Sequence, residues 1–153
     1  MGAAMIHGDF IIKEVDGVGH AMVLRYLNAQ EPSFPALKDH HLENGHWWVA
    51  RLTLGRDFVG FAGLVPMTPF DGYWFCKRAY VVPAHRGGGL QRMFLRLRED
   101  KAVTLGARAL IGECAGDNRP SENNFLKSGF MHTSPEQVWG APGSIFFIKR
   151  LAA

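Results

Sequence analysis

A run of twelve residues, 81–92, constrains this chain more than any other stretch: Val-Val-Pro-Ala-His-Arg-Gly-Gly-Gly-Leu-Gln-Arg. Residues 73–82 are rich in aromatic side chains and end in a β-branched pair, which is typical of a strand. After the glycines, Leu90, Met93, Phe94 and Leu97 recur at the spacing of one helix face. We therefore predict a strand, a glycine-rich turn and a helix.

A turn of this kind can hold an anion. Consecutive glycines let backbone N–H groups converge without a Cβ in the way, and a helix N-terminus adds partial positive charge. Arg86 and Arg92 add two full charges. A phosphate or pyrophosphate is the expected ligand, although the glycines alone are equally compatible with a plain turn.

Two common phosphate sites are excluded by the spacing. No Gly-Lys-Ser/Thr sequence follows the glycines, so the turn is not a P-loop. A dinucleotide-binding fold is poorly supported, because the chain has no G-x-G-x-x-G with an acidic residue downstream.

A third pattern fits the residues. Residues 81–90 read Val-x-Pro-x-x-Arg-Gly-x-Gly-Leu, which resembles the acyl-CoA loop of the GNAT N-acetyltransferase superfamily. Residues 118–130 resemble the family segment N-x-x-S-x-x-x-Y-x-x-x-G-F, with Phe125 at the tyrosine position. Both blocks occur in the family's order and at its usual separation. Together they cover about residues 73–133.

The resemblance implies an α/β fold of the α+β type. A single mixed, mostly antiparallel sheet of about six to seven strands, flanked by about four helices, would form one GNAT domain over residues 1–153. Residues 1–8 are expected to be loose. Asp16 is expected to cap a first helix over 18–28, whose apolar side carries Met22, Val23, Tyr26 and Leu27. The expected strands span 9–15, 46–54, 58–65, 73–82, 109–115, 130–132 and 144–150. The remaining helices are expected over 36–43, 90–105 and 120–128.

Acetyl-CoA is the co-substrate that the resemblance implies. The loop would hold its pyrophosphate, and the backbone of residues 80–82 would meet its pantetheine arm and polarise the thioester carbonyl. Gln91 replaces the family's usual small residue and is expected to point outward. Asn118 and Ser121 have a second possible role at the start of a helix. The implied cofactor-binding residues are Tyr80, Val81, Val82, Arg86, Gly87, Gly88, Gly89, Leu90, Gln91, Arg92, Asn118, Ser121 and Phe125.

Two groups are candidates for the proton transfers. An alkyl ammonium with a pKa near 10.4 must lose a proton before it attacks, and Glu113 is the candidate base, matching a glutamate of family N-terminal acetyltransferases. Alternatively, Glu113 faces solvent or pairs with an arginine. In many relatives a tyrosine protonates the thiolate, but Phe125 has no proton to give. Tyr80 is the candidate substitute; Tyr73, Ser121, water, or no acid at all remain alternatives.

The acceptor side is less specific. Phe34, in the loop between Pro32 and Pro35, and Trp139, in a Gly/Pro-rich loop, are the candidate substrate contacts. The first helical pair commonly walls the acceptor site in the family. For Phe34, packing on the surface is the alternative. The sequence does not identify the amine, and acetyl is the default acyl group.

Composition sets the remaining bounds. Cys76 and Cys114 are expected to be buried reduced thiols, because their spacing suits neither a metal nor a pair. His40 and His41 are expected to point apart on a helix, and no metal site is expected. No apolar run has membrane-spanning length and no signal peptide is visible, so no membrane contact is expected and the cytoplasm is the expected location.

Three hypotheses about the function remain. The first is an N-acetyltransferase acting on a small-molecule or peptide amine, for which edge strands at the C-terminus would suit a homodimer. The second is a catalytically weak or inactive acyl-CoA-binding sensor or scaffold, which the phenylalanine at position 125 favours. The third is nucleic-acid binding, suggested by the net charge of +3 and the pI near 9.1 but supported by no motif.

Overall fold

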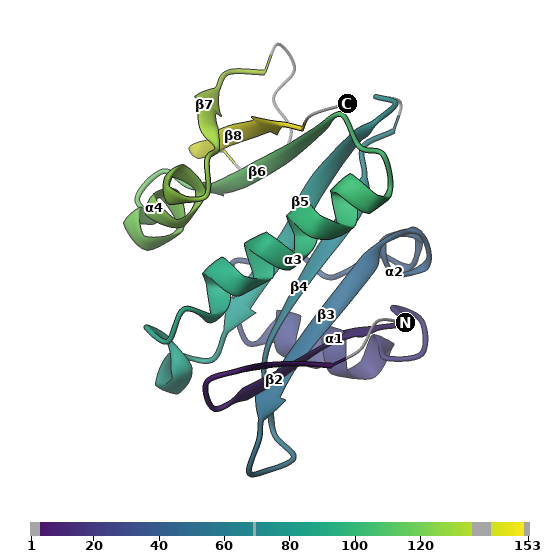
Figure 1. Cartoon of the computed structure of the whole chain (residues 1–153), viewed down its shortest axis with the longest axis vertical. Coiled ribbons are helices and arrows are strands. Elements are labelled where there is room, and N and C mark those ends of the chain that lie inside the picture. Colours follow the sequence, from purple (N-terminus) through teal and green to yellow (C-terminus); the bar gives the residue numbers. More distant parts are fainter. Residues whose placement is uncertain (1–3, 69, 136–141, 152–153) are drawn as a thin grey trace. The chain divides into compact units, whose positions relative to one another are not determined.

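The structure is a computed structural model that describes residues 4–68, 70–135 and 142–151 (Figure 1). Its described residues form eight strands, four α-helices and one 3-10 turn. In chain order these are β1 Met5–His7, β2 Phe10–Val15, α1 Ala21–Ala29, α2 Asp39–Asn44, β3 His46–Leu52, β4 Phe58–Pro66, β5 Tyr73–Val81, η1 Pro83–His85, α3 Leu90–Thr104, β6 Ala109–Ala115, α4 Arg119–Lys127, β7 Met131–Thr133 and β8 Ser144–Arg150.

The strands follow the order β1-β2-β3-β4-β5-β6-β8-β7 in one sheet. The pair β5–β6 is parallel, with Tyr73 opposite Ala109 and Phe75 opposite Ile111. The pairs β1–β2, β2–β3, β3–β4, β6–β8 and β7–β8 are antiparallel. The predicted fold class is therefore confirmed: a mixed, mostly antiparallel sheet with four helices. Its strand count is slightly higher than expected.

The chain divides into two compact units. Unit 1 comprises residues 1–65 and 77–94, and unit 2 comprises residues 66–76 and 95–153. Strand β5 and helix α3 each contribute residues to both. A single domain over residues 1–153 stays a prediction.

The additional strand lies at the N-terminus of unit 1. Residues 1–8 were expected to be loose, but Met5 pairs with Ile12 and His7 with Phe10. Gly8, at φ +57°, turns the chain between the two strands, a conformation that glycine adopts without steric cost. This correction matters for the site, because it fixes His7 and Phe10 in space.

The core of unit 1 is built on β3, which is buried at residues 47–50, and on β4, which is buried at residues 59–65. Trp47 is fully buried and stacks on Phe61, with ring centroids 6.4 Å apart. An ideal Cβ at Gly63 would lie 2.4 Å from the Trp47 ring, so the absence of a side chain there makes room for the indole. Core packing is thus the role of Trp47.

Helix α1 differs from its prediction in both start and face. Its N-cap is His20, and the carboxylate of Asp16 instead accepts a hydrogen bond from the Gly19 N–H in the preceding turn. The buried face carries Leu24, Leu27 and Asn28, whereas Met22 and Tyr26, expected on the apolar side, are 87% and 66% exposed. The buried asparagine explains the error, since an apolar count does not recognise a face that includes a polar residue.

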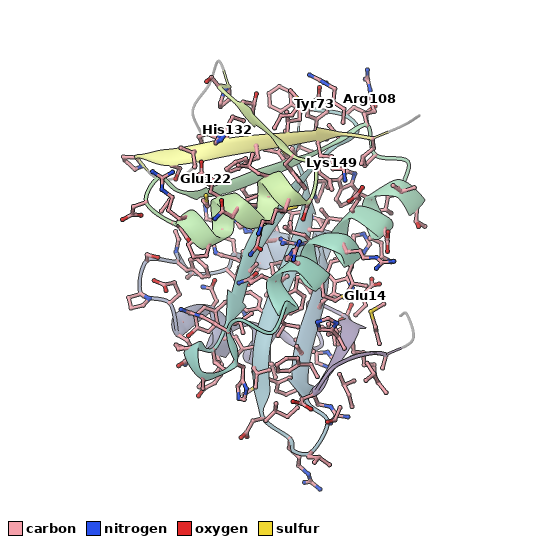
Figure 2. The ribbon with its side chains drawn as sticks, turned by 60° about the vertical axis from the view of Figure 1, so that its left-hand side comes forward. Glu14, Tyr73, Arg108, Glu122, His132 and Lys149 are labelled. Atoms are coloured by element: carbon pink, nitrogen blue, oxygen red, sulfur yellow. The ribbon has the colours of Figure 1, made fainter. Side chains whose placement is uncertain are left out.

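Unit 2 packs α4 on β6. The ring of Phe125 fills the space over Gly112, where an ideal Cβ would lie 2.3 Å from its Cε1. The same ring stacks on Phe147, with centroids 4.8 Å apart and an interplanar angle of 16°. Lys149 of β8 donates to Glu99 of α3 and to the Ser128 carbonyl (Figure 2), which ties the strand to both helices.

Two further predictions are confirmed. Cys76 and Cys114 are buried and free, and Gly106 closes α3 at φ +74°, in the left-handed conformation expected of a C-terminal cap. None of the helices in the described ranges is long and apolar enough to cross a membrane.

Candidate functional site

The glycine-rich turn of unit 1 has the predicted strand–turn–helix geometry. Strand β5 ends at Val81, η1 follows, and α3 begins at Leu90, which is 2% exposed. Gly87 and Gly89 have φ of +87° and +82°, values that disfavour any residue with a Cβ. Two of the three glycines are therefore required by backbone conformation, and the turn leads directly into a helix N-terminus, which favours anions.

Side chains of the turn brace it against β5. Arg86 donates from Nε to the Val81 carbonyl at 2.8 Å, and its guanidinium lies 5.5 Å from the centre of the Tyr80 ring. Gln91 reaches back to the Ala79 carbonyl at 3.4 Å. The expectation that Gln91 points outward is therefore wrong, because its long side chain finds an acceptor on the strand. Arg92 is exposed in the first turn of α3.

The N-terminal hairpin lies against the same turn, and this contact was not predicted. Nε2 of His7 lies 3.2 Å from the Gly88 carbonyl oxygen. Phe10 packs edge-on against His85, with ring centroids 6.0 Å apart. An ideal Cβ at Gly88 would lie 3.5 Å from Phe10, which is an ordinary contact distance.

The end of β5 offers fewer backbone groups to a ligand than expected. The Val82 N–H donates to the Val59 carbonyl of β4 at 2.8 Å, and the Val81 carbonyl accepts from Arg86. Val82 is therefore not the N–H that would polarise a thioester carbonyl. The Tyr80 side chain is 6% exposed.

Phe34 lies next to Tyr80. The two rings meet edge to face, with centroids 6.5 Å apart, and the Arg78 guanidinium lies 5.2 Å from the centre of the Phe34 ring. The structure thus brings together Phe34 and Tyr80, two of the predicted site residues in unit 1. Trp139, the other predicted substrate contact, lies outside the described residues.

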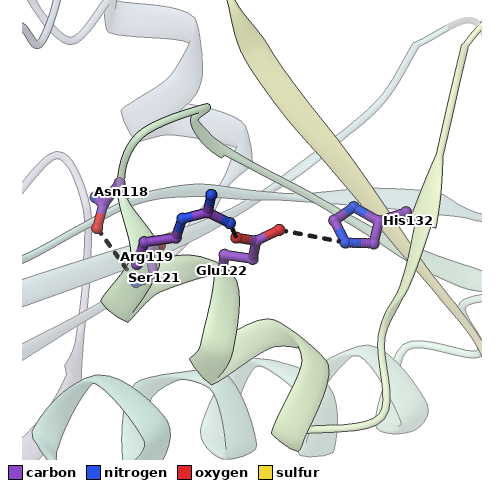
Figure 3. A network of polar contacts seen from close by, with 5 residues as sticks. All are labelled: Asn118, Arg119, Ser121, Glu122 and His132. Carbon is purple, nitrogen blue, oxygen red and sulfur yellow. Dashed lines mark hydrogen bonds and ion pairs between the residues drawn. The ribbon is translucent and has the colours of Figure 1, made fainter.

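In unit 2, Asn118 and Ser121 begin helix α4. Asn118 is the N-cap, and its Oδ1 accepts a hydrogen bond from the Ser121 N–H at 3.2 Å (Figure 3). The alternative role as a helix cap is therefore observed. Ser121 also hydrogen-bonds the thiol of Cys114, which opposes burial; burial prevails and raises the pKa of that thiol to about 11.

An ionic network beside this cap was not predicted. Glu122 is reached by Nη1 of Arg119 at 2.9 Å and by Nε2 of His132 at 3.3 Å (Figures 2 and 3). The His132 ring also packs on Phe147, with centroids 4.8 Å apart. The network links the first turn of α4 to β7. The i,i+3 spacing of Arg119 and Glu122 on α4 is a local signal for their pair, whereas the contact of Glu122 with His132 joins different elements and has no local signal.

Glu113 and Phe125 lie on opposite sides of β6. Gly112 and Cys114 contact α4, and strand alternation places Glu113 on the other face, where it is half-buried and in register with Phe146. Phe125 is 6% exposed within its aromatic cluster. Its ring is therefore a core element of unit 2, and its predicted contact with a cofactor remains a prediction.

The histidine pair differs from its prediction. The rings of His40 and His41 do not point apart; their centroids are 4.1 Å apart. Burial, together with the positive charges of Lys77, His40, Arg78 and Lys38, lowers the pKa of His41 to about 4. Cations surround this imidazole, which does not suit a metal ion. In the described part of the chain, no three His, Cys, Asp or Glu residues group as metal ligands.

Solved structures share this fold. The NatC complex bound to Gag peptide and CoA contains a chain 14% identical over 94% of this chain and 99% of its own, with a TM-score of 0.77. The Salmonella typhimurium protein yncA, solved with its cofactor acetyl-CoA, is 20% identical over 95% of both chains at a TM-score of 0.70. The ribosomal-protein-alanine N-acetyltransferase of Brucella melitensis is 22% identical over 92% of this chain and 99% of its own, with a TM-score of 0.66.

At these identities the likeness shows the fold alone, and none of the curated proteins matches the chain. The sequence profile of the acetyltransferase (GNAT) family, however, matches residues 18–130. That range includes the glycine-rich turn, β6 and α4. With the turn geometry and the strand order, this match shows that the chain belongs to the GNAT acetyltransferase family.

Proposed function

We propose that the protein transfers an acetyl group from acetyl-CoA directly to a primary amine. The observation that carries the proposal is the turn 86–90, where two glycines at positive φ lead into the N-terminus of α3 in a chain of the GNAT family. Backbone N–H groups of this turn and the exposed Arg92 are suited to the pyrophosphate of the cofactor.

In the proposed reaction the neutral amine attacks the thioester carbonyl carbon, the C–S bond breaks with release of the CoA thiolate, and the attacking nitrogen gives up one proton to water as the amide forms. Glu113 is the proposed base that takes the proton from the ammonium form of the acceptor. Its half-buried position on β6 supports this role, because partial burial keeps a carboxylate accessible to a substrate.

The thiolate must then gain a proton. Tyr80 is the proposed donor, since it is the tyrosine nearest to the turn in unit 1, and its ring is held by Phe34 and Arg86. Water is a sufficient alternative, because a thiol with a pKa near 8.5 leaves readily as a thiolate. Phe34 is the proposed contact for the acceptor, and Asn118 and Ser121 the proposed contacts for the cofactor arm.

The acceptor is a small-molecule or peptide amine in this proposal, and the site of action is the cytoplasm. The guanidinium of Arg78 lies 5.2 Å from the centre of the Phe34 ring and so places a positive charge beside the proposed acceptor contact. An amine that also carries an anionic group, such as an amino acid or an acidic peptide, is therefore the first class to test.

The test is a screen of amino acids, peptides with free N-termini, polyamines and aminoglycosides with acetyl-CoA, detecting the acetylated amine by mass spectrometry and the thiol by a disulfide reagent. We expect one class to be acetylated. Glu113→Gln should lower kcat by roughly 100-fold or more while leaving the Kd for CoA unchanged. A wild-type kcat in this variant would exclude Glu113 as the base.

A second function, acyl-CoA sensing without turnover, is favoured by one observation: Phe125 has no hydroxyl and is buried against Phe147. It predicts CoA binding with no acetylated product for any amine in the screen. Acetylated product that depends on Glu113 would exclude it.

A further inference from the structure

Arg78, in the middle of β5, has an unusual backbone conformation. Its φ is +55°, and no other non-glycine residue among those described has a positive φ. An L-residue pays a steric cost in this region and persists there only where its surroundings hold it. A left-handed residue also interrupts the regular alternation of side chains along a strand. The contacts of its side chain show what holds it.

The Arg78 guanidinium is bonded to both ends of segment 28–35, which joins the end of α1 to the chain before α2. Its Nε donates to Oδ1 of Asn28 at 3.1 Å, and its Nη2 donates to the Pro35 carbonyl at 3.0 Å. Asn28, only 3% exposed, closes the triangle by donating from Nδ2 to the same Pro35 carbonyl at 3.0 Å. A planar fork of donors suits this arrangement, whereas a lysine has a single nitrogen.

The same guanidinium lies against the ring between those two ends. It is 5.2 Å from the centre of Phe34, whose ring meets Tyr80 edge to face. Within the segment, Ser33 donates from Oγ to Glu31 at 2.8 Å, and the Phe34 N–H donates to the Glu31 carbonyl at 3.0 Å. The side-chain hydrogen bonds of Arg78 and the ring contact of Phe34 with Tyr80 tie this segment to the strand.

We propose that Arg78 is a positioning residue that holds segment 28–35 against β5 and so fixes Phe34 where the acceptor amine binds. The acceptor part of this inference rests on the proposed function, while the fixing of the segment does not. The left-handed conformation of Arg78 directs its guanidinium toward Asn28 and Pro35. The strained backbone at Arg78 and the ordering of segment 28–35 therefore belong to the same arrangement.

Hydrogen exchange of the protein, with and without CoA, tests the fixing directly. We expect amides of peptide 28–37 to exchange roughly tenfold faster in Arg78→Lys and in Arg78→Gly, the factor that the loss of one or two hydrogen bonds gives. Protection of β3 should stay unchanged. Arg25→Lys is the matched control, because the Arg25 side chain also bridges two elements, but its ion pair is with Asp39 of α2 rather than with Asn28 or Pro35.

Arg78→Gly separates the effect of the backbone conformation from the effect of the side-chain contacts. Glycine accepts φ +55° without cost, so a residue that mattered only through its backbone would leave peptide 28–37 as protected as in the wild type or more so. Wild-type protection of this peptide in both Arg78 variants would overturn the proposal. Loss of protection in the Arg25→Lys control to the same extent would also overturn it.

Steady-state kinetics with the best amine of the screen test the acceptor part. For Arg78→Lys we expect the KM for the amine to rise about fivefold or more, with the KM for acetyl-CoA and kcat within about twofold. Equal changes in both KM values would contradict positioning of the acceptor. If no amine is acetylated, the proposed function fails, and the exchange experiment still decides whether Arg78 fixes the segment.

Discussion

The three consecutive glycines of the turn differ in a way that one pair of substitutions can resolve. Gly87 has φ +87° and no heavy atom within 4 Å of where a Cβ would stand. Gly88 has no positive φ, and its Cβ would make an ordinary contact with Phe10 at 3.5 Å. Gly87→Ala is therefore limited by backbone conformation alone, and Gly88→Ala is its matched control.

The expected magnitude follows from the left-handed conformation. An L-residue there costs about 1–2 kcal/mol. If the free turn keeps its conformation, Gly87→Ala lowers the free energy of unfolding by that amount. If the free turn relaxes, cofactor binding must restore it, and the Kd for CoA rises about 5- to 30-fold. In both cases the free energy of unfolding of the CoA-saturated protein falls by about 1–2 kcal/mol.

Denaturant unfolding at saturating CoA, together with calorimetric titration of CoA, measures both quantities. Gly88→Ala should match the wild type or gain up to about 1 kcal/mol, because alanine restricts the unfolded chain. A Gly87→Ala variant with wild-type stability and affinity would refute the reasoning. An equal loss in Gly88→Ala would refute it as well, since it would mean that volume rather than φ limits the turn.

Three further predictions concern the core and the titrating groups. Gly112→Ala should lower the free energy of unfolding by about 1–3 kcal/mol, because its Cβ would overlap the Phe125 ring; the double variant with Phe125→Leu should recover part of this, and strictly additive losses would contradict the overlap. Stability should fall as pH drops from about 6.5 toward 4, because His41 protonates near 6.5 when unfolded but only near pH 4 when folded; a His41→Asn variant with the wild-type slope would exclude this source. Cys114, with a pKa of about 11, should react with iodoacetamide far more slowly in the native protein than in urea, and equal rates would contradict its burial.

Local signals predicted the elements around the turn well. Strand β6 was expected over 109–115 and observed at Ala109–Ala115, and α3 was expected over 90–105 and observed at Leu90–Thr104. Glycines mark these boundaries in the sequence: Gly87 and Gly89 precede α3, and Gly106 lies between α3 and β6. The cap role of Asn118 was also available from the sequence, because asparagine followed by Arg-Pro is a common helix start.

Features that depend on distant partners were not predictable in this way. Strand β1 forms because Met5–His7 finds β2, and nothing in three residues indicates that pairing. An asparagine is ordinarily expected at the surface, yet Asn28 is buried. Its amide hydrogen-bonds to Arg78, 50 residues away, and to Pro35, 7 residues away. The left-handed φ of Arg78 is likewise not expected from its residue type, because arginine has no preference for that region.

The central claim is that the turn 86–92 binds the pyrophosphate of acetyl-CoA. Calorimetric titration with acetyl-CoA, CoA, ATP and NAD tests it most directly, using the wild type and Gly87→Ala. We expect one site for acetyl-CoA and CoA and weaker or absent binding of ATP and NAD. In Gly87→Ala we expect either a higher Kd for CoA or a lower free energy of unfolding of the CoA-saturated protein. No heat of binding for acetyl-CoA at millimolar concentration, together with no thermal stabilisation, would contradict it.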